Sequence, residues 1–375
     1  MPLKIGITCY PTYGGSGVVA TELGKSLADL GHEIHFVSYA LPIRLDKFHE
    51  RIFFHEVEVL PYPLFQYPPY DLALAAKMTE IANYARLDLF HVHYALPHAI
   101  SAYLAKSMIE DREVKIITTL HGTDITLVGM DRSYFPITKF GIRKSDGVTT
   151  VSKYLQLLTQ TQVGREDVEV IPNFVDTEFF RKSPIPQCSK HLFAPSGEPV
   201  LMHVSNFRPV KRIINVIEIF QRVLKKEPSR LVFVGDGPER SGAERYCHEN
   251  NITDRVLFLG RQDNLPDLMG CADVFLLPSE LESFGLVALE AMSCEVPVVA
   301  TLVGGLPEVV VHGETGFLAN LGDVDKMADY TLEILRNSAL REKMGKAGRR
   351  RAVETFDQNK IVPHYERYYE EILSR

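Results

Sequence analysis

Two glutamates eight residues apart, Glu282 and Glu290, follow a buried strand-like run. Ser283 predicts the N-cap of a helix, which places Glu290 on an otherwise apolar helix where a buried carboxylate needs a partner. On one helix this spacing separates the carboxylates by about 12 Å, more than in either class of glycosidase. The pair therefore indicates two binding points along an elongated ligand; the alternative is that Glu290 reaches the surface or pairs with a cation. The helix mouth would also present free backbone N–H groups, those of Phe284 and Gly285.

Two cations three residues apart, Arg208 and Lys211, follow another strand-like run and enter a helix. Arginine offers a planar fork and lysine a point charge, so the pair suits a pyrophosphate, with Asn206 in the same loop. The alternative is a solvated basic helix start, which is unfavourable because cations oppose the positive end of the helix dipole. We therefore predict an anion at this loop.

A glycine-rich turn, Gly14-Gly15-Ser16-Gly17, lies between the first strand-like run and a helix that begins near Val18. Such a turn lets backbone N–H groups approach an anion, and a tight strand-to-helix turn is the alternative explanation. A dinucleotide site would need GxGxxG and an acidic residue at the end of the second strand. That strand ends Val37-Ser-Tyr-Ala40, so NAD binding is disfavoured.

Histidines end two neighbouring strand-like runs, in the motifs His91-Val-His93 and His121-Gly-Thr-Asp124. Strand alternation puts His91 and His93 on one face and puts Thr119 on the face of His121. We expect these side chains to share the floor of one ligand site. Two alternatives stay open: the histidines pack in the core, or they hold the metal of a hydrolase together with Asp124.

Apolar runs alternate with helix-period segments, which predicts an α/β protein with parallel sheets covered by helices on both faces. A Pro-rich stretch over residues 181–199 predicts a linker. We expect two doubly wound, Rossmann-like domains that face each other across a cleft, over residues 1–180 and 181–354, followed by a helical tail over residues 355–375. The strand-like runs lie at residues 3–9, 33–38, 89–93, 115–120, 147–151, 200–204, 231–234, 256–259, 274–277 and 296–300.

The composition excludes several classes of protein. The 375 residues carry 41 Lys and Arg against 48 Asp and Glu, a net charge of −7, which argues against broad nucleic-acid binding. No apolar stretch is long enough to span a membrane, and the N-terminus resembles a strand more than a signal peptide. The five cysteines are odd in number and lack a CxxC spacing, which predicts reduced thiols in a cytoplasmic protein.

The motifs together resemble those of the retaining family 4 glycosyltransferases, which have the GT-B fold. The resemblance covers nearly the whole chain, with Ile171-Pro-Asn-x-Val-Asp176, Gly235-Asp-Gly-Pro238, Glu282-x7-Glu290 and Gly304-Gly-x-Pro-Glu308 in the family's order. It implies that the second domain binds a nucleotide sugar and the first domain binds the acceptor. It also implies that residues 355–375 return to the first domain.

The same resemblance implies a role for each candidate residue. Glu290 would hold the ribose hydroxyls and Glu282 the sugar hydroxyls. Arg208 and Lys211 would bind the pyrophosphate and offset the leaving-group charge, an electrostatic task that needs no metal. His121 would lie near the anomeric carbon. The other donor-binding candidates are Gly14, Gly15, Gly17, Asn206, Phe284, Gly285 and, through its backbone, Arg261.

Within the family, three segments are similar to members of the bacillithiol pathway that transfer N-acetylglucosamine from UDP-GlcNAc to the hydroxyl of L-malate. These segments are residues 11–17, 90–95 and 205–212. The similarity implies UDP-GlcNAc and L-malate as substrates and no metal cofactor. The candidates for holding the two malate carboxylates are Ser16, Tyr94, Thr119 and Lys153.

Three other functions are weighed against this one. The chain could be a family 4 enzyme with another small or lipid acceptor, a metal-dependent hydrolase that uses His91, His93 and His121, or a non-catalytic nucleotide-sugar-binding protein. The apolar, Pro-rich loop over residues 61–69 would suit a lid, a membrane-touching patch or a homodimer face. Because the helix over residues 18–30 carries only one cation, Lys25, we favour a soluble acceptor and no stable membrane insertion.

Overall fold

The computed structural model describes residues 2–12, 14–60, 63–126, 129, 131–182 and 190–375. Two compact units make up the chain: unit 1 consists of residues 1–173 and 359–375, and unit 2 consists of residues 174–358. Each unit is built around a parallel sheet, which confirms the predicted pair of Rossmann-like domains. Part of the predicted linker, residues 183–189, lies outside the described residues, and the part that follows begins with a short helix, α7 (Lys190–Phe193).

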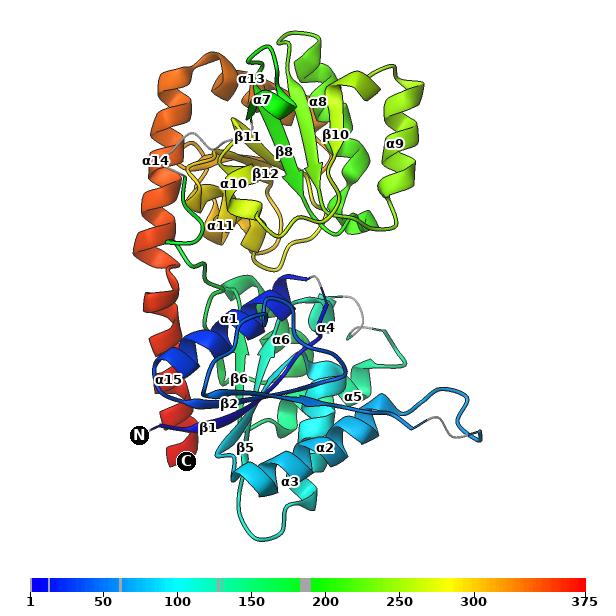
Figure 1. Cartoon of the computed structure of the whole chain (residues 1–375), viewed down its shortest axis with the longest axis vertical. Helices are drawn as coiled ribbons and strands as arrows, with labels where there is room; N and C mark the ends of the chain where they lie inside the picture. The colour runs from blue at the N-terminus through cyan, green and yellow to red at the C-terminus, as the bar shows by residue number, and fades with distance from the viewer. Residues whose placement is uncertain (1, 13, 61–62, 127–128, 130, 183–189) are drawn as a thin grey trace. The chain divides into compact units, whose positions relative to one another are not determined.

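The sheet of unit 1 has seven strands in the order β3-β2-β1-β4-β5-β6-β7 (Figure 1). Its strands are β1 (Lys4–Thr8), β2 (Glu33–Ser38), β3 (Ile52–Glu56), β4 (Leu89–His93), β5 (Lys115–Leu120), β6 (Gly147–Thr150) and β7 (Val168–Val170). Its helices are α1 (Gly15–Asp29), α2 (Tyr70–Ala85), α3 (Ile100–Met108), α4 (Thr123–Thr126), α5 (Phe135–Lys144), α6 (Lys153–Val163) and α15 (Gln358–Ser374).

Alternation along β4 divides the two faces of this sheet. Phe90 and Val92 pack in one apolar cluster with residues of α2 and α3. His91 and His93 point to the other face, where Tyr369 of α15 lies with its hydroxyl 2.7 Å from His91 Nδ1. On β6, Val148 N donates to the Tyr368 hydroxyl at 2.9 Å. Helix α15 is therefore part of unit 1, although it ends the chain.

The sheet of unit 2 has six strands in the order β10-β9-β8-β11-β12-β13. Its strands are β8 (Val200–Val204), β9 (Arg230–Val234), β10 (Val256–Phe258), β11 (Val274–Leu277), β12 (Val298–Thr301) and β13 (Gly316–Ala319). Its helices are α7 (Lys190–Phe193), α8 (Ile213–Leu224), α9 (Arg240–Glu249), α10 (Leu265–Met269), α11 (Leu286–Ser293), α12 (Leu306–Val309), α13 (Val324–Arg336) and α14 (Ser338–Thr355).

The cysteines differ in part from the prediction. Cys9, Cys247 and Cys294 are free and buried, in keeping with the predicted thiols. Cys271 is disulfide-bonded, so the prediction that all five are reduced is wrong for this residue. Within the part of the chain that the structure describes, no helix is both long enough and apolar enough to cross a membrane.

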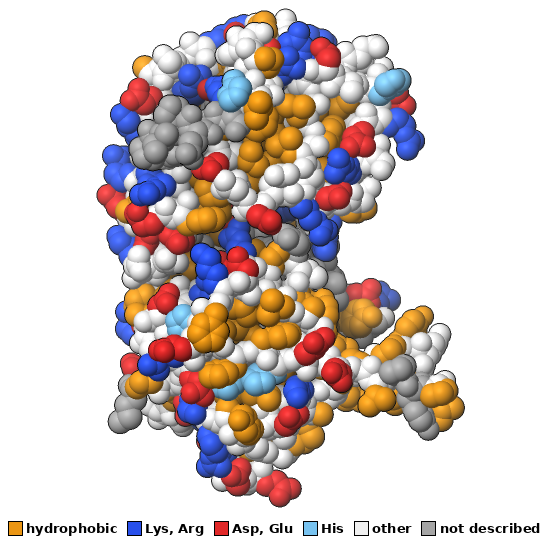
Figure 2. All heavy atoms as spheres, viewed as in Figure 1, with side chains coloured by type: hydrophobic (Ala, Val, Ile, Leu, Met, Phe, Trp, Pro, Cys, Tyr) orange, Lys and Arg blue, Asp and Glu red, His pale blue; other side chains and the backbone are white. Residues whose placement is uncertain are grey.

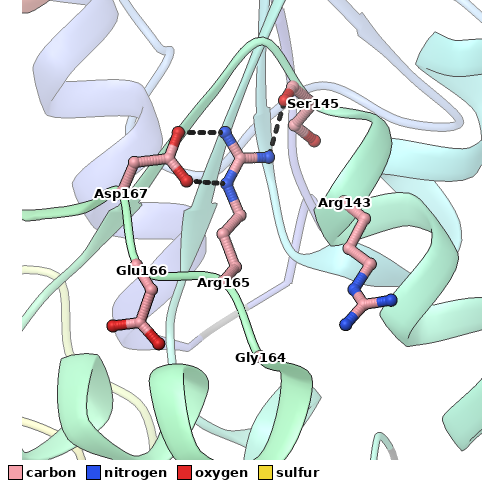
Figure 3. A pocket seen from close by; sticks show the side chains of 6 residues that line it. All are labelled: Arg143, Ser145, Gly164, Arg165, Glu166 and Asp167. Atoms are coloured by element: carbon pink, nitrogen blue, oxygen red, sulfur yellow. Dashed lines mark hydrogen bonds and ion pairs between the residues drawn. The ribbon is translucent and has the colours of Figure 1, made fainter.

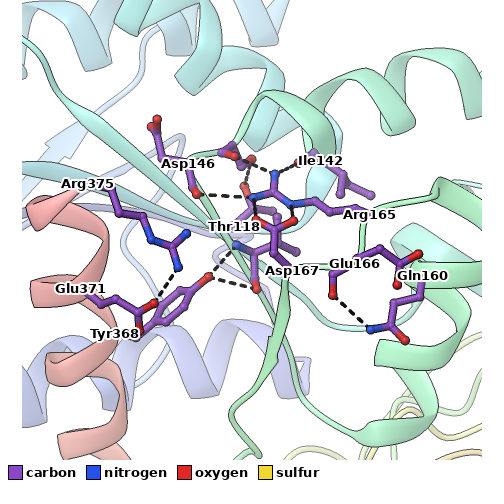
Figure 4. A network of polar contacts seen from close by, with 12 residues as sticks. Thr118, Ile142, Asp146, Gln160, Arg165, Glu166, Asp167, Tyr368, Glu371 and Arg375 are labelled. Atoms are coloured by element: carbon purple, nitrogen blue, oxygen red, sulfur yellow. Dashed lines mark hydrogen bonds and ion pairs between the residues drawn. The ribbon is translucent and has the colours of Figure 1, made fainter.

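Arg165 braces the amino ends of β6 and β7 in unit 1. Its guanidinium donates to the carbonyl oxygens of Ile142, in the last turn of α5, at 2.6 Å and of Ser145, the C-cap of that helix, at 2.7 Å. It also pairs with the Asp167 carboxylate through Nε at 3.1 Å and Nη2 at 3.0 Å (Figure 4). Arg165 is 8% exposed, so these carbonyls depend on it for donors.

Arg165→Leu should lower the free energy of unfolding by about 3 kcal/mol, because it leaves the Ile142 and Ser145 carbonyls and the Asp167 carboxylate without their donor. Chemical denaturation measures the change. Arg143→Leu is the matched control, since Arg143 is exposed and donates a single bond, to the Val163 carbonyl at 2.9 Å. An equal decrease in the free energy of unfolding in the two variants would contradict this stabilising role of Arg165.

Candidate functional site

A hollow of about 300 Å³ lies beside this brace and is polar (Figure 3). Its lining residues precede β6 and β7, at the amino ends of the strands. Ligands of open α/β sheets bind beyond the carboxyl ends of the strands. The functional site is therefore expected at the opposite edge of each sheet, where the predicted residues lie. The hollow is lined by Arg143, Ser145, Gly164, Arg165, Glu166 and Asp167.

In unit 2, the loops after β8 and β11 emerge side by side because these strands are hydrogen-bonded neighbours. The loop after β11 carries Glu282, whose Oε1 lies 2.5 Å from the Lys211 ammonium and accepts a 2.9 Å bond from the Ser279 hydroxyl. Both partners of the ion pair are mostly buried, at 20% and 11% side-chain exposure. Of the four residues predicted to act in catalysis, His121, Arg208, Lys211 and Glu282, the last two are thus in direct contact.

In two of the predicted motifs, glycine is required because the backbone of a neighbouring loop approaches it closely. A Cβ on Gly304, where φ is +54°, would lie 1.9 Å from the Glu282 carbonyl oxygen. A Cβ on Gly235, where φ is +115°, would lie 1.9 Å from the Ser205 carbonyl oxygen. Only glycine tolerates both the positive φ and such a close approach. The turns after β9 and β12 therefore press against the two loops that carry the charged residues.

Arg208 differs from Lys211 in having no fixed partner. It is exposed at the start of a short 3-10 helix (Pro209–Lys211), and among the residues with described coordinates none pairs with its guanidinium. The next arginine, Arg212, is bound to Glu280 through Nη2 at 2.6 Å. Arg208 is thus the cation of this loop that is available to an anionic ligand.

Helix α11 carries Glu290, which is 6% exposed. The predicted N-cap, Ser283, is wrong: the cap is Gly285, at φ 96°, and the first intrahelical bond is donated by Ala288. A Cβ on Gly285 would lie 2.5 Å from the side chain of Leu306, so the turn must be glycine. Phe284 is 3% exposed and its ring packs edge-on against Phe356, which leaves its backbone, not its ring, to meet a ligand.

The two remaining donor candidates of unit 2 lie in neighbouring loops. Asn206 follows β8, and its Oδ1 is buried without a hydrogen-bond partner among the described residues. Arg261 follows Gly260 after β10 and is exposed. Gly260 accepts a 2.7 Å bond from the Gly235 backbone, which ties this loop to the turn after β9.

In unit 1, the glycine-rich turn forms the N-terminus of α1. Gly14 is the N-cap and provides no side-chain cap, and the first turn holds no acidic residue. An N-terminus of this kind favours an anion, and Ser16 lies in the same turn. A Cβ on Gly17 would lie 2.6 Å from the Tyr10 carbonyl oxygen, so the loop folds tightly back on the helix. Tyr13 lies outside the described residues.

Thr119 lies inside the molecule, contrary to a role at an open acceptor site. It is fully buried, and its hydroxyl lies 2.7 Å from His91 Nε2 and 2.6 Å from the Thr149 hydroxyl. Tyr369 occupies the other nitrogen of His91. Burial lowers the pKa of His91 to about 3, so this ring is neutral. These contacts attach α15 to the sheet, and we do not propose Thr119 as an acceptor-binding residue.

His93 and His121 contact each other and do not converge on a metal. Nδ1 of His93 lies 2.8 Å from Nε2 of His121, a distance at which the two nitrogens share a proton. Both nitrogens of His91 are also occupied. No group of three or more His, Cys, Asp or Glu side chains is placed to hold a metal ion in the portion of the chain with described coordinates. The hydrolase alternative is not supported.

Asp124 fixes the loops that carry His121 and Tyr94. Its carboxylate accepts from the backbone N–H groups of Gly122 at 2.9 Å and Ala95 at 3.3 Å. Burial raises its pKa to about 6. Tyr94 itself has φ 87°, and its ring contacts Tyr10 edge-on at 5.4 Å and the tilted ring of His121 at 5.5 Å between centroids.

Lys153 opens helix α6 and is exposed, directly after the N-cap Ser152, whose hydroxyl accepts from Leu155 N at 3.2 Å. It follows β6, at the same edge of the sheet as the turns after β1, β4 and β5. Sequence reasoning missed Tyr369, Ser279 and Asp124 as supports of the site. Asp124 alone had a usable signal, as the acid that ends the motif His121-Gly-Thr-Asp124.

Comparison with known proteins places these residues in a family. Residues 13–179 match the model "Glycosyltransferase Family 4", and residues 185–351 match "Glycosyl transferases group 1". The chain is 50% identical over 374 residues to N-acetyl-alpha-D-glucosaminyl L-malate synthase of Bacillus anthracis, covering 100% of this chain and 98% of that protein. It is 30% identical over 251 residues to a GDP-mannose-dependent phosphatidylinositol monomannoside mannosyltransferase of Mycobacterium tuberculosis, covering 63% and 64% of the two chains.

Solved structures agree on the fold. The Anabaena protein HepE in complex with UDP and glucose superposes with a TM-score of 0.83 at 21% identity, over 98% of this chain and 99% of that one. Sucrose-phosphate synthase from Thermosynechococcus elongatus gives a TM-score of 0.82 at 24% identity, over 99% of both chains. At these sequence identities, the structural similarity supports the fold alone.

Proposed function

This chain belongs to the family 4 glycosyltransferases, and we propose that it transfers N-acetylglucosamine from UDP-GlcNAc to the hydroxyl of L-malate with retention of configuration. The single observation that carries the proposal is the 50% identity, over the whole chain, to a protein named N-acetyl-alpha-D-glucosaminyl L-malate synthase. The product would enter bacillithiol biosynthesis. The cytoplasm, predicted from the sequence, is proposed as its location.

Unit 2 binds the donor. Arg208 binds the diphosphate with its unpaired guanidinium, and Lys211 exchanges the Glu282 carboxylate for a phosphate oxygen. That exchange frees Glu282 to accept from sugar hydroxyls. Glu290, buried on α11, accepts from the ribose hydroxyls. The backbone N–H groups of Gly285, the N-cap of that helix, and of Phe284 just before it donate to an anionic group of the donor. Asn206 and the backbone of Arg261 complete the donor site of unit 2.

Unit 1 binds the acceptor. Two malate carboxylates need donors, and this edge of the sheet offers the N-terminus of α1 with Ser16, the Tyr94 hydroxyl and the Lys153 ammonium. Tyr94 is held in place by Tyr10 and His121 on its two sides. A small dianion fits such a site better than a lipid does.

The proposed mechanism depends on stabilising the negative charge that develops on the leaving group. As the glycosidic bond to UDP breaks, negative charge accumulates on the β-phosphate, and Arg208 and Lys211 stabilise it more in the transition state than in the ground state. The malate hydroxyl attacks from the face that UDP leaves, and its proton passes to the departing phosphate. Two cations of the protein supply this stabilisation, so the proposed transfer needs no divalent metal.

Other acceptors remain the second candidate, because the mycobacterial relative is named for a phosphatidylinositol mannoside. Exposed apolar side chains do gather on the segment between β3 and α2 of unit 1 (Figure 2), namely Leu60, Leu64, Phe65 and Tyr67. Part of the predicted loop, residues 61 and 62, lies outside the described residues. This segment is the proposed homodimer face, which a sedimentation measurement tests.

An acceptor panel tests the proposed reaction. With UDP-GlcNAc and EDTA present, L-malate should accelerate UDP release, whereas D-malate, succinate and inositol should not, because transfer needs a hydroxyl correctly placed between two carboxylates. Substituting UDP-glucose or GDP-mannose for the donor should lower the rate. UDP release that is equal with and without L-malate would contradict the acceptor, and loss of activity in EDTA that added metal restores would contradict the metal-free mechanism.

A further inference from the structure

Two neutral imidazoles in unit 1 share a single proton. His93 ends β4 and is fully buried, His121 follows β5 and is 9% exposed, and their rings stack with centroids 5.1 Å apart. Burial lowers the pKa of His121 to about 3 and holds the pKa of His93 well below its usual value, so both are neutral at pH 7. A neutral imidazole has one N–H and one lone pair, so across the 2.8 Å contact either His93 or His121 donates.

The other nitrogen of His93 decides the direction of this bond. His93 Nε2 is buried and has no hydrogen-bond partner among the described residues. If His121 donated, the proton of His93 would sit on Nε2, as a buried N–H without an acceptor. If His93 donates from Nδ1, its Nε2 is only a bare lone pair. Buried unpartnered N–H groups are rarer than buried acceptors that lack a donor, so the second arrangement is favoured.

We propose that His93 is a positioning residue that donates from Nδ1 to Nε2 of His121 and holds His121 as the Nδ1–H tautomer. In that tautomer the lone pair of His121 is occupied, and its remaining nitrogen carries a proton. His121 can therefore donate a hydrogen bond to a substrate oxygen but cannot act as a general base. The consequence for catalysis rests on the proposed function, whereas the tautomer does not.

The surroundings of His93 keep this arrangement in place. The His91 ring lies 4.5 Å from the His93 ring between centroids, but both nitrogens of His91 are occupied by Tyr369 and Thr119, so His91 does not compete for His93 Nδ1. His98 Nδ1 lies 2.5 Å from the His93 carbonyl oxygen and must donate to it. The backbone and the ring plane of His93 are thus both fixed by neighbours.

Nitrogen NMR of the native full-length protein tests the tautomer directly. In protein labelled with ¹⁵N-histidine at pH 7, long-range proton–nitrogen correlations distinguish a protonated ring nitrogen from a bare one. The signals of His121 are identified by their loss in His121→Asn. We expect a protonated Nδ1 and a bare Nε2. A protonated Nε2, or a doubly protonated ring, would overturn the proposal whether or not the protein transfers N-acetylglucosamine.

Three variants test the consequence for turnover. His93→Leu removes the donor and should lower kcat on the order of tenfold or more, with KM for UDP-GlcNAc within about twofold, because a mispositioned tautomer impairs the reacting groups more than binding. His93→Asn places an amide N–H near the position of Nδ1 and should recover most of the loss.

The matched control is His55→Leu, which breaks another 2.8 Å contact between histidines, His35 Nδ1 to His55 Nε2, at the β2–β3 edge of the same sheet. It should leave kcat unchanged. Equal kcat for His93→Leu and the native protein would overturn the positioning role, as would His93→Asn and His93→Leu being equally impaired while both unfold at the native temperature.

Discussion

Arg208→Ala is expected to lower kcat/KM for UDP-GlcNAc by about 100- to 1000-fold, the range found when one preorganised donor to a developing negative charge is removed. The guanidinium has no side-chain partner in the described part of unit 2, so a ligand is the only group that it is free to meet there. Lys211 takes its own phosphate oxygen when it leaves Glu282, so it does not replace the Arg208 guanidinium. Initial rates of UDP release with saturating L-malate measure the effect.

Arg212→Ala is the control, because Arg212 is four residues further along the same loop but is bound to Glu280 at the surface. An exposed ion pair contributes about 0–1 kcal/mol to stability, so Arg212→Ala should keep native activity and folding. Arg208 is exposed as well, so its loss should not shift the unfolding midpoint. An Arg208→Ala enzyme within threefold of native activity would contradict the proposed phosphate contact.

Acid should destabilise unit 1 before unit 2. Four buried histidines surround the site of unit 1, and burial lowers the pKa of each: to about 3 for His91 and His121, to about 4 for His98, and well below its usual value for His93. Each stays neutral in the folded state while the unfolded chain takes up protons below pH 6.5. Stability is therefore unaffected above pH 6.5 and falls as the pH drops toward 4.

One group opposes this trend. The pKa of Asp124 is raised to about 6, so the folded state takes up a proton there first, and acid stabilises it between pH 6 and 4. Four of these five groups favour unfolding in acid and one favours folding. Burial also lowers the pKa values of His35 and His55 in the same unit, which act in the same direction as the four, so unit 1 should lose stability between pH 6 and pH 5.

Hydrogen exchange at pH 7, 6 and 5, corrected for the intrinsic exchange rate, measures this difference between the units. Amides of β4 and β5 should lose protection with falling pH, whereas those of β8 and β11 should lose less. The described part of unit 2 has one buried histidine with a lowered pKa, His203, whose value is about 4. Equal losses in the two sheets would show that the histidines of unit 1 do not control its acid stability.

The buried strands were predictable from the sequence because they are continuous apolar runs, whereas three edge or near-edge strands were missed. β3 (Ile52–Glu56) is largely half-exposed, β7 (Val168–Val170) has only three residues, and β13 (Gly316–Ala319) begins with glycine. None of these segments has the uninterrupted apolar run that identifies a central strand. The parallel fold itself did not depend on them.

The cluster of Arg208, Lys211 and Glu282 was predictable because each residue follows closely after a strand that the sequence identifies. Arg208 and Lys211 lie three residues apart, and Glu282 follows the next strand in the sheet, so their proximity follows from the strand order. The role of Thr119 could not be predicted in this way. Its face of the sheet was identified correctly, but the bond between Tyr369 and His91 joins positions 278 residues apart, and local sequence gives no sign that α15 covers that face.

The most direct test of the account is the structure of the product formed from UDP-GlcNAc and ¹³C-labelled L-malate. We predict a single product in which the anomeric carbon of N-acetylglucosamine is α-linked to the hydroxyl oxygen of malate, identified by a proton–carbon correlation across the new bond and by the small coupling of the anomeric proton. A β-linked product, a sugar ester on a malate carboxylate, or free N-acetylglucosamine with unmodified malate would contradict it.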